Sequence, residues 1–356
     1  MRKLIIFSSL VFLILPLTVS GQEIQGKPTT LVDVHSLGPQ KLGPLPPVVT
    51  PPNNPQSSLK ILLGKQLYFD TRLSKDNTIS CATCHNPAMG WSDAGPTSTG
   101  INGQKGGRRS PPVCNAAYSP LQFWDGRAPS LEEQAKGPIQ NPVEMGSTHE
   151  VMIKSVDNIP GYVEEFKQVY GTSVITVDMI ADAIAAFERT VVTTDSPFDR
   201  YARGDKKALS KLEKDGLEVF TGKGHCTACH WGPYFSDGRF HNLGVPEYDP
   251  AKPDMGRFDV TKNPADKGAF KTPTIRDVAL RAPYMHSGSE KTLEDVVDLY
   301  DKGGRVRSAN LDQLIVPLGL TAYEKKALVT FMRILMTSTN PEVANVKPIP
   351  ASELPK

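Results

Sequence analysis

Two short runs constrain this chain more than any other feature of its sequence. Residues 81–85 read Cys-Ala-Thr-Cys-His and residues 226–230 read Cys-Thr-Ala-Cys-His, the C-x-x-C-H attachment signature of a c-type haem. Two thiols at this spacing form thioethers with the vinyl groups of one porphyrin, and the adjacent histidine becomes the proximal ligand of the iron. C-x-x-C pairs also bind zinc, but here a histidine follows at once in both copies. The sequence therefore predicts two covalent haems, held by Cys81, Cys84 and His85 and by Cys226, Cys229 and His230.

The start of the chain predicts export. Two basic residues precede an apolar run from Leu4 to about Val19, and the small residues Ser20 and Gly21 follow, as in a Sec signal peptide that covers residues 1–21. An uncleaved membrane anchor is the alternative, although the apolar run is short for a span. Because c-type haem is attached outside the bacterial cytoplasm, we expect the protein in the periplasm or at the cell surface.

The charge balance excludes one class of partner. Removal of residues 1–21 takes away two of the 40 basic residues and none of the 38 acidic ones. A chain so evenly balanced gives no reason to expect nucleic acid as a partner. Of the five cysteines, only Cys114 lies outside the two motifs, and we expect it to be a small buried thiol.

The expected fold is mostly α-helical, with two cytochrome c-like haem domains and long irregular loops. With 356 residues the chain is long enough for two domains. A proline-rich arm without a core (22–57) precedes a first haem domain (58–208), and a second haem domain (209–340) precedes a C-terminal tail (341–356). Apolar residues at helical spacing predict helices at 58–70, 131–135, 177–192, 293–300 and 322–336. The apolar stripe of 177–192, from Val177 to Val191, is expected in the core, and Thr321 and Glu324 predict a capping box at the start of the last helix. A charged segment at 206–215 marks the approach to the second domain. Both halves share the order motif, loop, helix, which is consistent with a distant internal duplication.

A set of ordered motifs extends this prediction. The run Phe-Trp-Asp-Gly-Arg-Ala at 123–128 follows the first C-x-x-C-H, and Gln-Ala-Lys-Gly-Pro at 134–138 and Glu-Met at 144–145 come next. Ala-Pro-Tyr-Met-His at 282–286 follows the second C-x-x-C-H. In this order and spacing, over roughly residues 58–336, the sequence resembles the bacterial di-haem cytochrome c peroxidase and MauG family. A single polar residue of these motifs, taken alone, would more often be structural.

The resemblance implies unequal roles for the two haems. The first, on His85, would be the peroxidatic haem, with Glu144 as the acid–base residue of its distal pocket, Gln134 as a hydrogen-bonding neighbour and Pro138 lining the same pocket. One carboxylate that takes a proton from the near peroxide oxygen and returns it to the leaving oxygen suits heterolytic cleavage. Trp124 would be a relay between the haems; an ordinary core aromatic is the alternative reading.

The sequence differs from one branch of the family at the sixth ligand of the first haem. In that branch a loop histidine is the sixth ligand in the oxidised enzyme. The matching position in residues 98–104 is Ile101, and no histidine lies between His85 and His149. We therefore expect the first haem to have an open or water-bound sixth position in the oxidised state.

The second haem, on His230, would receive or store electrons. Where many of these peroxidases supply a methionine, the matching position is Tyr300, as in the MauG branch. A phenolate ligand favours ferric and higher iron states. The alternative is that Tyr300 only packs and that Met285 or another residue is the ligand; the sequence leaves both readings open.

The family also holds a calcium ion between the haems. The resemblance places backbone carbonyl ligands at Arg281 and Pro283, but the usual asparagine ligand aligns with Arg109, which cannot coordinate a cation. Nearby Asn115 could substitute. His286 would lie near the haem edge, whereas His149, His225 and His241 are expected at the surface.

The leading function is a periplasmic di-haem peroxidase that reduces hydrogen peroxide with electrons from a small donor, a cytochrome c or a cupredoxin. The first alternative is a MauG-like oxidase that modifies a partner protein, which Ile101 and Tyr300 favour. The second is a di-haem electron carrier without catalysis, which would have no need of Glu144 and Gln134. The resemblance also implies a homodimer.

Overall fold

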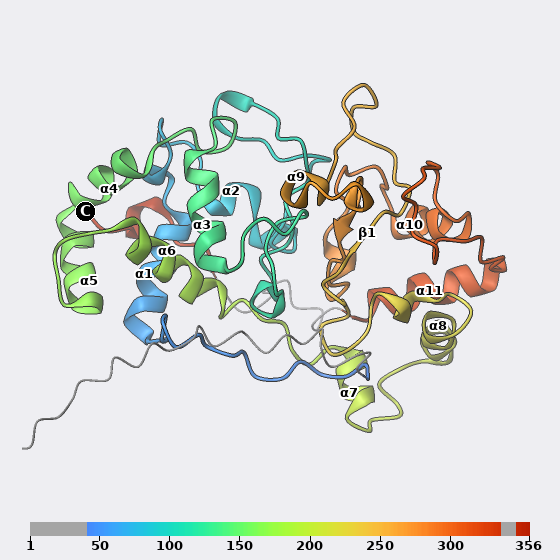
Figure 1. Cartoon of the computed structure of the whole chain (residues 1–356). Helices are drawn as coiled ribbons and strands as arrows, with labels where there is room; N and C mark the ends of the chain where they lie inside the picture. The colour runs from blue at the N-terminus through green and yellow to red at the C-terminus, as the bar shows by residue number, and fades with distance from the viewer. Residues whose placement is uncertain (1–40, 336–346) are drawn as a thin grey trace, which may run out of the picture. The chain divides into compact units, whose positions relative to one another are not determined.

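The computed structural model describes residues 41–335 and 347–356. The predicted signal peptide, residues 22–40 of the predicted arm and residues 341–346 of the predicted tail lie outside this part of the chain. Within it the fold is mostly α-helical, as predicted, and the single two-stranded sheet described is short (Figure 1). None of the described helices combines the length and the hydropathy needed to cross a lipid bilayer.

The helices and strands follow the chain order shown in Figure 1. They are α1 (Ser58–Phe69), α2 (Cys81–Cys84), α3 (Leu131–Gln140), α4 (His149–Asp157), α5 (Pro160–Tyr170), α6 (Val177–Glu188), α7 (Pro197–Ala202), α8 (Lys211–Thr221), β1 (Phe240–His241), α9 (Phe258–Thr261), β2 (Phe270–Lys271), α10 (Leu293–Asp301) and α11 (Ala322–Arg333). Strands β1 and β2 pair antiparallel, with Phe240 opposite Lys271 and His241 opposite Phe270.

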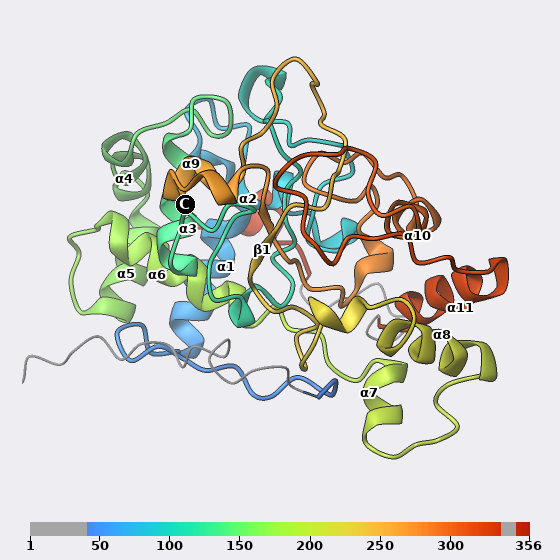
Figure 2. The same ribbon diagram turned by 45° about the vertical axis from the view of Figure 1, so that its right-hand side comes forward.

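Two large hydrophobic clusters and a small third one (Ala116, Leu131, Ala185) form the core of the described residues. Every member of the first lies between Leu63 and Val191, and every member of the second lies between Phe198 and Leu335. Helices α1 and α3 to α6 accordingly group together, and α7, α8, α10 and α11 form another group, in both views (Figures 1 and 2). Each fully buried aliphatic or aromatic side chain in such a cluster contributes roughly 1.5–3 kcal/mol.

The two helix groups are built alike around a glycine. A Cβ atom added at Gly64 of α1 would lie 1.7 Å from the carbonyl oxygen of Ala183 in α6, and one added at Gly216 of α8 would lie 2.1 Å from that of Ala327 in α11. In each half, therefore, the helix that precedes the C-x-x-C-H motif packs backbone to backbone on a later helix. This shared arrangement favours the internal duplication suggested by the motif order.

Apolar residues at helical spacing are nearly all buried in α6 but only in part in α1. In α6 the stripe Ile180, Ile184, Phe187 is buried as expected. In α1 the apolar leucines divide: Leu63 and Leu67 are buried, whereas Leu59 and Leu62 are about half exposed. The reason is that α1 turns the face that carries Gly64 toward α6, and the polar residues Lys60 and Gln66 are buried with it.

The helix bounds also differ in places. Helix α3 continues to Gln140 rather than ending at residue 135, even though Pro138 lies inside it, and α6 ends at Glu188. Helix α11 begins with the expected capping box, in which Thr321 and Glu324 bond each other's backbone nitrogens. Helices α4, α5 and α7 were not predicted, and α8 was predicted only as a charged approach segment. The apolar faces of these four helices are short. Side-chain caps at Thr148, Ser196 and Ser210 help to define the starts of α4, α7 and α8.

The arm and the C-terminal end bind onto the helical core. Residues 41–57 contain no helix or strand, but Leu42 packs against the second cluster and Asn54 is fully buried beside α3, donating to Glu132 at 2.8 Å. At the other end, the carbonyl oxygen of Lys356 accepts from the backbone of Gly161 in α5 at 2.9 Å. The arm thus contacts both helix groups, α3 through Asn54 and the second cluster through Leu42, which the sequence did not indicate.

Candidate haem sites

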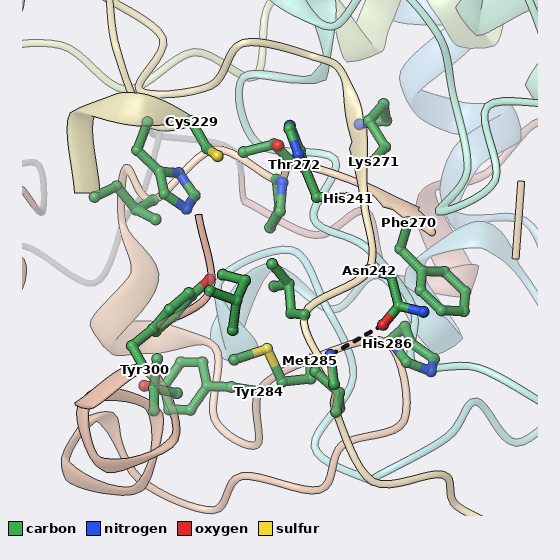
Figure 3. A pocket seen from close by; sticks show the side chains of 18 of the residues that line it. Cys229, His241, Asn242, Phe270, Lys271, Thr272, Tyr284, Met285, His286 and Tyr300 are labelled. Atoms are coloured by element: carbon green, nitrogen blue, oxygen red, sulfur yellow. Dashed lines mark hydrogen bonds between the residues drawn. The ribbon is translucent and has the colours of Figure 1, made fainter. Parts of the chain in front are cut away.

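The second C-x-x-C-H motif opens onto a large cavity. The motif begins as a 3-10 turn (Cys226–Ala228), and Cys226, Cys229 and His230 all line a cavity of about 480 Å³. Met285 and Tyr300 line the same cavity, from the segment after β2 and from α10 (Figure 3). The two thiols and the imidazole therefore face one shared space.

The ring of His230 is held as a proximal ligand needs to be. Its Nδ1 lies 2.9 Å from the carbonyl oxygen of Phe235, an arrangement that fixes the ring and leaves Nε2 for a metal. Burial lowers the pKa of His230 and so favours the neutral imidazole, which is the form that binds iron.

The first motif is ordered by different local contacts. Helix α2 starts at a capping box formed by Ser80 and Thr83, and the hydroxyl of Tyr68 donates to the carbonyl oxygen of His85 at 2.9 Å. The Nδ1 atom of His85 is shielded from solvent, and the backbone of Pro111 and of Trp91 opposes the effect of burial on the ring. Burial nonetheless lowers the pKa of His85 and so favours the neutral imidazole, which is the form that binds iron.

These residues fit haem better than zinc. Zinc binds thiolates, yet burial raises the pKa of Cys84 to about 11 and that of Cys226 to about 12. The one three-residue metal-ligand group found among the described residues is Cys229, Asp237 and His241. Its histidine lies between two carboxylates, with Nδ1 2.6 Å from Asp312 and Nε2 3.0 Å from Asp237, and is unavailable as a ligand.

Glu144 lies near the first motif. Its carboxylate accepts from Asn141 Nδ2 at 2.7 Å, and its charge helps to raise the pKa of the Cys84 thiol. Burial raises the pKa of Glu144, while Arg127 and the Asn141 hydrogen bond oppose that shift. The residue is therefore a half-buried carboxyl whose protonated and ionised forms are brought closer in free energy, as an acid–base group requires.

Gln134 and Pro138 share one face of α3, because residues four apart lie on the same side of a helix. Both are partly buried. The carbonyl oxygen of Pro138 accepts from the backbone of Met145 at 3.2 Å, so the end of α3 is bonded to the turn that carries Glu144. The three residues of the predicted distal pocket thus come from one continuous unit of structure.

The loop with Ile101 lies beside the same turn. The backbone nitrogen of Ile101 donates to the carbonyl oxygen of Glu144 at 2.8 Å, and the sulfur of Cys84 lies 3.6 Å from the carbonyl oxygen of Thr99. The Ile101 side chain is 4% exposed and belongs to the first hydrophobic cluster. An apolar side chain therefore stands where the resemblance would put a ligand histidine.

Trp124 bridges the two halves of the site. Its Nε1 donates to the carbonyl oxygen of Arg109 at 2.9 Å, its own carbonyl oxygen accepts from the backbone of Lys271 at 2.8 Å, and its ring meets that of His286 edge to face at 6.3 Å. It also lines the cavity of the second motif. Trp124 therefore contacts both the loop after the first motif and the segments that line the second cavity.

Tyr300 and Met285 remain competing ligands for the second haem. Both side chains are drawn at the cavity in Figure 3, where the Tyr300 hydroxyl points inward. Burial raises the pKa of Tyr300, so its hydroxyl stays neutral unless a cation binds the oxygen.

The predicted calcium ligands do not fit a calcium ion. The carbonyl oxygen of Arg281 accepts from the guanidinium of Arg109 at 3.2 Å. Asn115, the possible substitute ligand, is fully buried with its side-chain oxygen bonded to the backbone of Thr193 at 2.9 Å. Pro283 lines the cavity of the second motif. A guanidinium lies where the resemblance implies a metal.

Several site residues could not be singled out from sequence. Asn141 and Arg127, which act on Glu144, belong to no motif that marks a proton-handling role. His241 was expected at the surface, but it is enclosed by carboxylates that raise its pKa to about 11 against the effect of burial. His149 is also partly buried, with Nε2 3.0 Å from the carbonyl oxygen of Lys136, whereas His225 is exposed as expected. His286 stacks on Phe270 with ring centroids 3.6 Å apart.

Comparison with known proteins agrees with this geometry. Residues 58–207 match the di-haem cytochrome c peroxidase family. The chain is 41% identical over 326 residues to cytochrome-c peroxidase IdrP1 of Pseudomonas sp. (strain SCT). This alignment covers 83% of this chain and 86% of that protein. The chain is also 41% identical over 288 residues to the methylamine utilization protein MauG of Methylorubrum extorquens, over 80% of each chain.

A solved structure gives the same result. A MauG-like protein associated with microbial copper homeostasis superposes with a TM-score of 0.76 at 33% identity, over 83% of this chain and 94% of that one. The chain is therefore an enzyme of the di-haem cytochrome c peroxidase family.

Proposed function

We propose that this enzyme is a periplasmic peroxidase that reduces hydrogen peroxide to water with electrons from a small redox protein, a cytochrome c or a cupredoxin. The observation that carries this proposal is the half-buried Glu144 beside the first C-x-x-C-H motif, with its pKa raised by burial. An electron carrier has no need of such a group. The periplasmic location rests on the predicted signal peptide and on where c-type haem is attached.

Two haem domains, with bounds near residues 58–208 and 209–340, are part of this proposal. The two hydrophobic clusters support them, and Phe198 in the second cluster favours a boundary somewhat earlier than residue 208. Cys81, Cys84 and His85 would hold the first haem, and Cys226, Cys229 and His230 the second. Haem iron, when bound, supplies the redox chemistry that oxygen–oxygen cleavage requires.

The protein residues would handle the protons. Reduction of one peroxide to two waters takes two electrons and two protons. Glu144, when ionised, would accept the proton of the near peroxide oxygen and return it to the leaving oxygen. Gln134 would orient the peroxide with its amide, which neither takes nor gives a proton at neutral pH. Pro138 would shape the pocket wall without adding a competing donor.

Trp124 would serve as the route between the two haem sites. Its contacts with Arg109 on one side and with Lys271 and His286 on the other support this role. The small donor protein would deliver electrons near the second haem, and a homodimer is an additional expectation that light scattering would check.

A second candidate function, oxidation of a partner protein in the manner of MauG, is favoured by Tyr300 and Ile101. A tyrosine at the second cavity and an apolar residue beside Glu144 are the two features that this reading needs. The identity to MauG equals that to the peroxidase, so overall similarity does not separate the two.

One assay separates these functions. Haem-loaded protein is mixed with hydrogen peroxide and reduced cytochrome c or cupredoxin, and donor oxidation is followed. Rapid turnover with two donor molecules oxidised per peroxide supports the peroxidase. Slow donor oxidation, with a mass change in an added candidate protein, supports the MauG-like oxidase. No consumption of peroxide above the haem-free background would exclude both and leave the carrier.

The ligand of the second haem is tested by substitution. If Tyr300 is the ligand, Tyr300→Phe changes the absorption and EPR spectra of that haem, whereas Met285→Leu leaves them unchanged. The reverse pattern would assign Met285 and remove the main support for the MauG-like reading.

A further inference from the structure

Arg109 is enclosed by backbone carbonyls. Arg109 is only 4% exposed to solvent. Nη1 donates to the carbonyl oxygen of Gly95 at 2.5 Å, and Nη2 donates to those of Arg281 and Ala282, each at 3.2 Å, and also to that of Asp93. Four carbonyl oxygens therefore converge on one guanidinium.

Such a cluster requires a positive charge at its centre. Converging carbonyl oxygens repel one another, and proteins commonly place a hard cation such as Ca²⁺ among them. A guanidinium meets the same need, because it carries a positive charge and offers five N–H donors in one plane. Burial lowers the pKa of Arg109 to about 10, with Asp93 opposing the shift, so the side chain stays protonated at neutral pH.

The carbonyls come from segments far apart in the chain. Asp93 and Gly95 follow the first C-x-x-C-H motif, whereas Arg281 and Ala282 follow the second. The backbone of Arg109 joins the same two regions, since its nitrogen donates to the carbonyl oxygen of His286 at 2.8 Å and its own carbonyl oxygen accepts from Trp124. The residue thus connects the loop after the first haem site to the segment that lines the second.

We infer that Arg109 is a built-in substitute for a divalent cation at the junction of the two haem sites, so that the enzyme holds this junction, and Trp124 within it, without a bound metal. Arg109 is a positioning residue in this role. The inference does not depend on whether the enzyme reduces peroxide or oxidises a protein. It replaces the calcium ion that the family resemblance implied.

The first test uses the wild-type, haem-loaded protein. Calcium content is measured after gel filtration, and thermal unfolding and the resting absorption spectrum are recorded with EGTA and with calcium chloride. We expect calcium well below one ion per chain and no change in melting temperature or spectrum between the two conditions. One tightly held calcium per chain, or a melting temperature that falls in EGTA, would overturn the inference.

The second test makes the junction depend on calcium. In Arg109→Asn the carbonyls lose their cation but gain a side-chain oxygen that a calcium ion can use. We expect a melting temperature several degrees below wild type in EGTA, which calcium chloride raises again. Arg109→Met, which has no ligand atom of this kind, should lose stability without recovery. Arg307→Asn removes an exposed arginine and is the matched control, with no response to calcium.

The calcium response distinguishes cation replacement from a merely structural arginine. Recovery in Arg109→Asn but not in Arg109→Met supports the inference. A melting temperature of Arg109→Asn that calcium leaves unchanged would overturn it. If Arg109→Asn yields no haem-loaded protein in the absence of calcium, the same comparison is made on its yield in cultures with and without added calcium.

Discussion

The replacement of Glu144 by glutamine tests the proposed chemistry at its central residue. Glutamine has nearly the shape of glutamate, and its side-chain oxygen can accept the 2.7 Å hydrogen bond that Asn141 donates to the Glu144 carboxylate. Burial already disfavours the ionised carboxyl, so a neutral amide should be tolerated without loss of stability. Glu144→Gln therefore removes proton transfer while leaving the local structure intact.

The expected loss follows from the role of a general acid–base group. Such a group typically contributes about 10²- to 10⁴-fold to the rate, and a tenfold change in rate corresponds to about 1.4 kcal/mol in the activation free energy. The variant should thus lose roughly 3 to 5 kcal/mol of transition-state stabilisation. Because peroxide binding does not require the proton transfer, the loss should appear in kcat more than in KM.

The assay is stopped-flow reduction of peroxide with a reduced donor in excess. Glu133→Gln is the matched control, since Glu133 lies on α3 with a side chain 50% exposed and pairs only with Lys136 at the surface. Melting temperature and resting spectrum should equal those of wild type in both variants. A Glu144→Gln enzyme that turns over at close to the wild-type rate would refute the assignment of Glu144 as the acid–base residue.

Three further predictions concern other parts of the structure. Ile101→His should give the oxidised first haem a low-spin spectrum and slow its reaction with peroxide until the protein is reduced; a spectrum unchanged from wild type would show that this loop cannot reach the iron. Arg127→Met removes a positive charge that lowers the pKa of Glu144, and the pKa of Glu144 should therefore rise further. Because the ionised carboxylate is the active base, the acid limb of the kcat/KM profile should move to higher pH. An acid limb that stays in place or moves to lower pH would contradict this. Gly64→Ala introduces a Cβ 1.7 Å from a carbonyl oxygen of α6 and should lower the free energy of unfolding by about 1–3 kcal/mol, measured by denaturant unfolding. Gly107→Ala is the control and should cost little, because nothing lies within 4 Å of its added Cβ. Equal effects of the two substitutions would argue against close α1–α6 packing.

The sequence predicted the features that depend on neighbours in the chain. Haem attachment needs two thiols and a histidine within five residues, so the motifs at 81–85 and 226–230 state it directly. The buried stripe of α6 follows from the helical period, and the capping box of α11 from Thr321 and Glu324, because both patterns span only a few positions. The roles proposed for Glu144 and Gln134 rest on the same kind of local information, because the family resemblance assigns them from short ordered motifs.

Other features depend on which segments contact each other in the fold, and a pattern along the sequence does not say which segments these are. Four leucines recur at helical spacing in residues 58–70, but the packing of α1 on α6 decides that Leu63 and Leu67 are buried while Leu59 and Leu62 are about half exposed. His241 read as a surface residue, but two carboxylates from distant segments enclose it.

The junction between the haem sites separates the two kinds of information most clearly. The sequence alone determined that Arg109 could not be a metal ligand, because a guanidinium has no lone pair to offer a cation. Only the tertiary structure decided what the residue does instead, because the four carbonyls around it come from segments that follow different haem motifs. Backbone carbonyls are present at every position of the sequence, and only folding makes them converge on one charge.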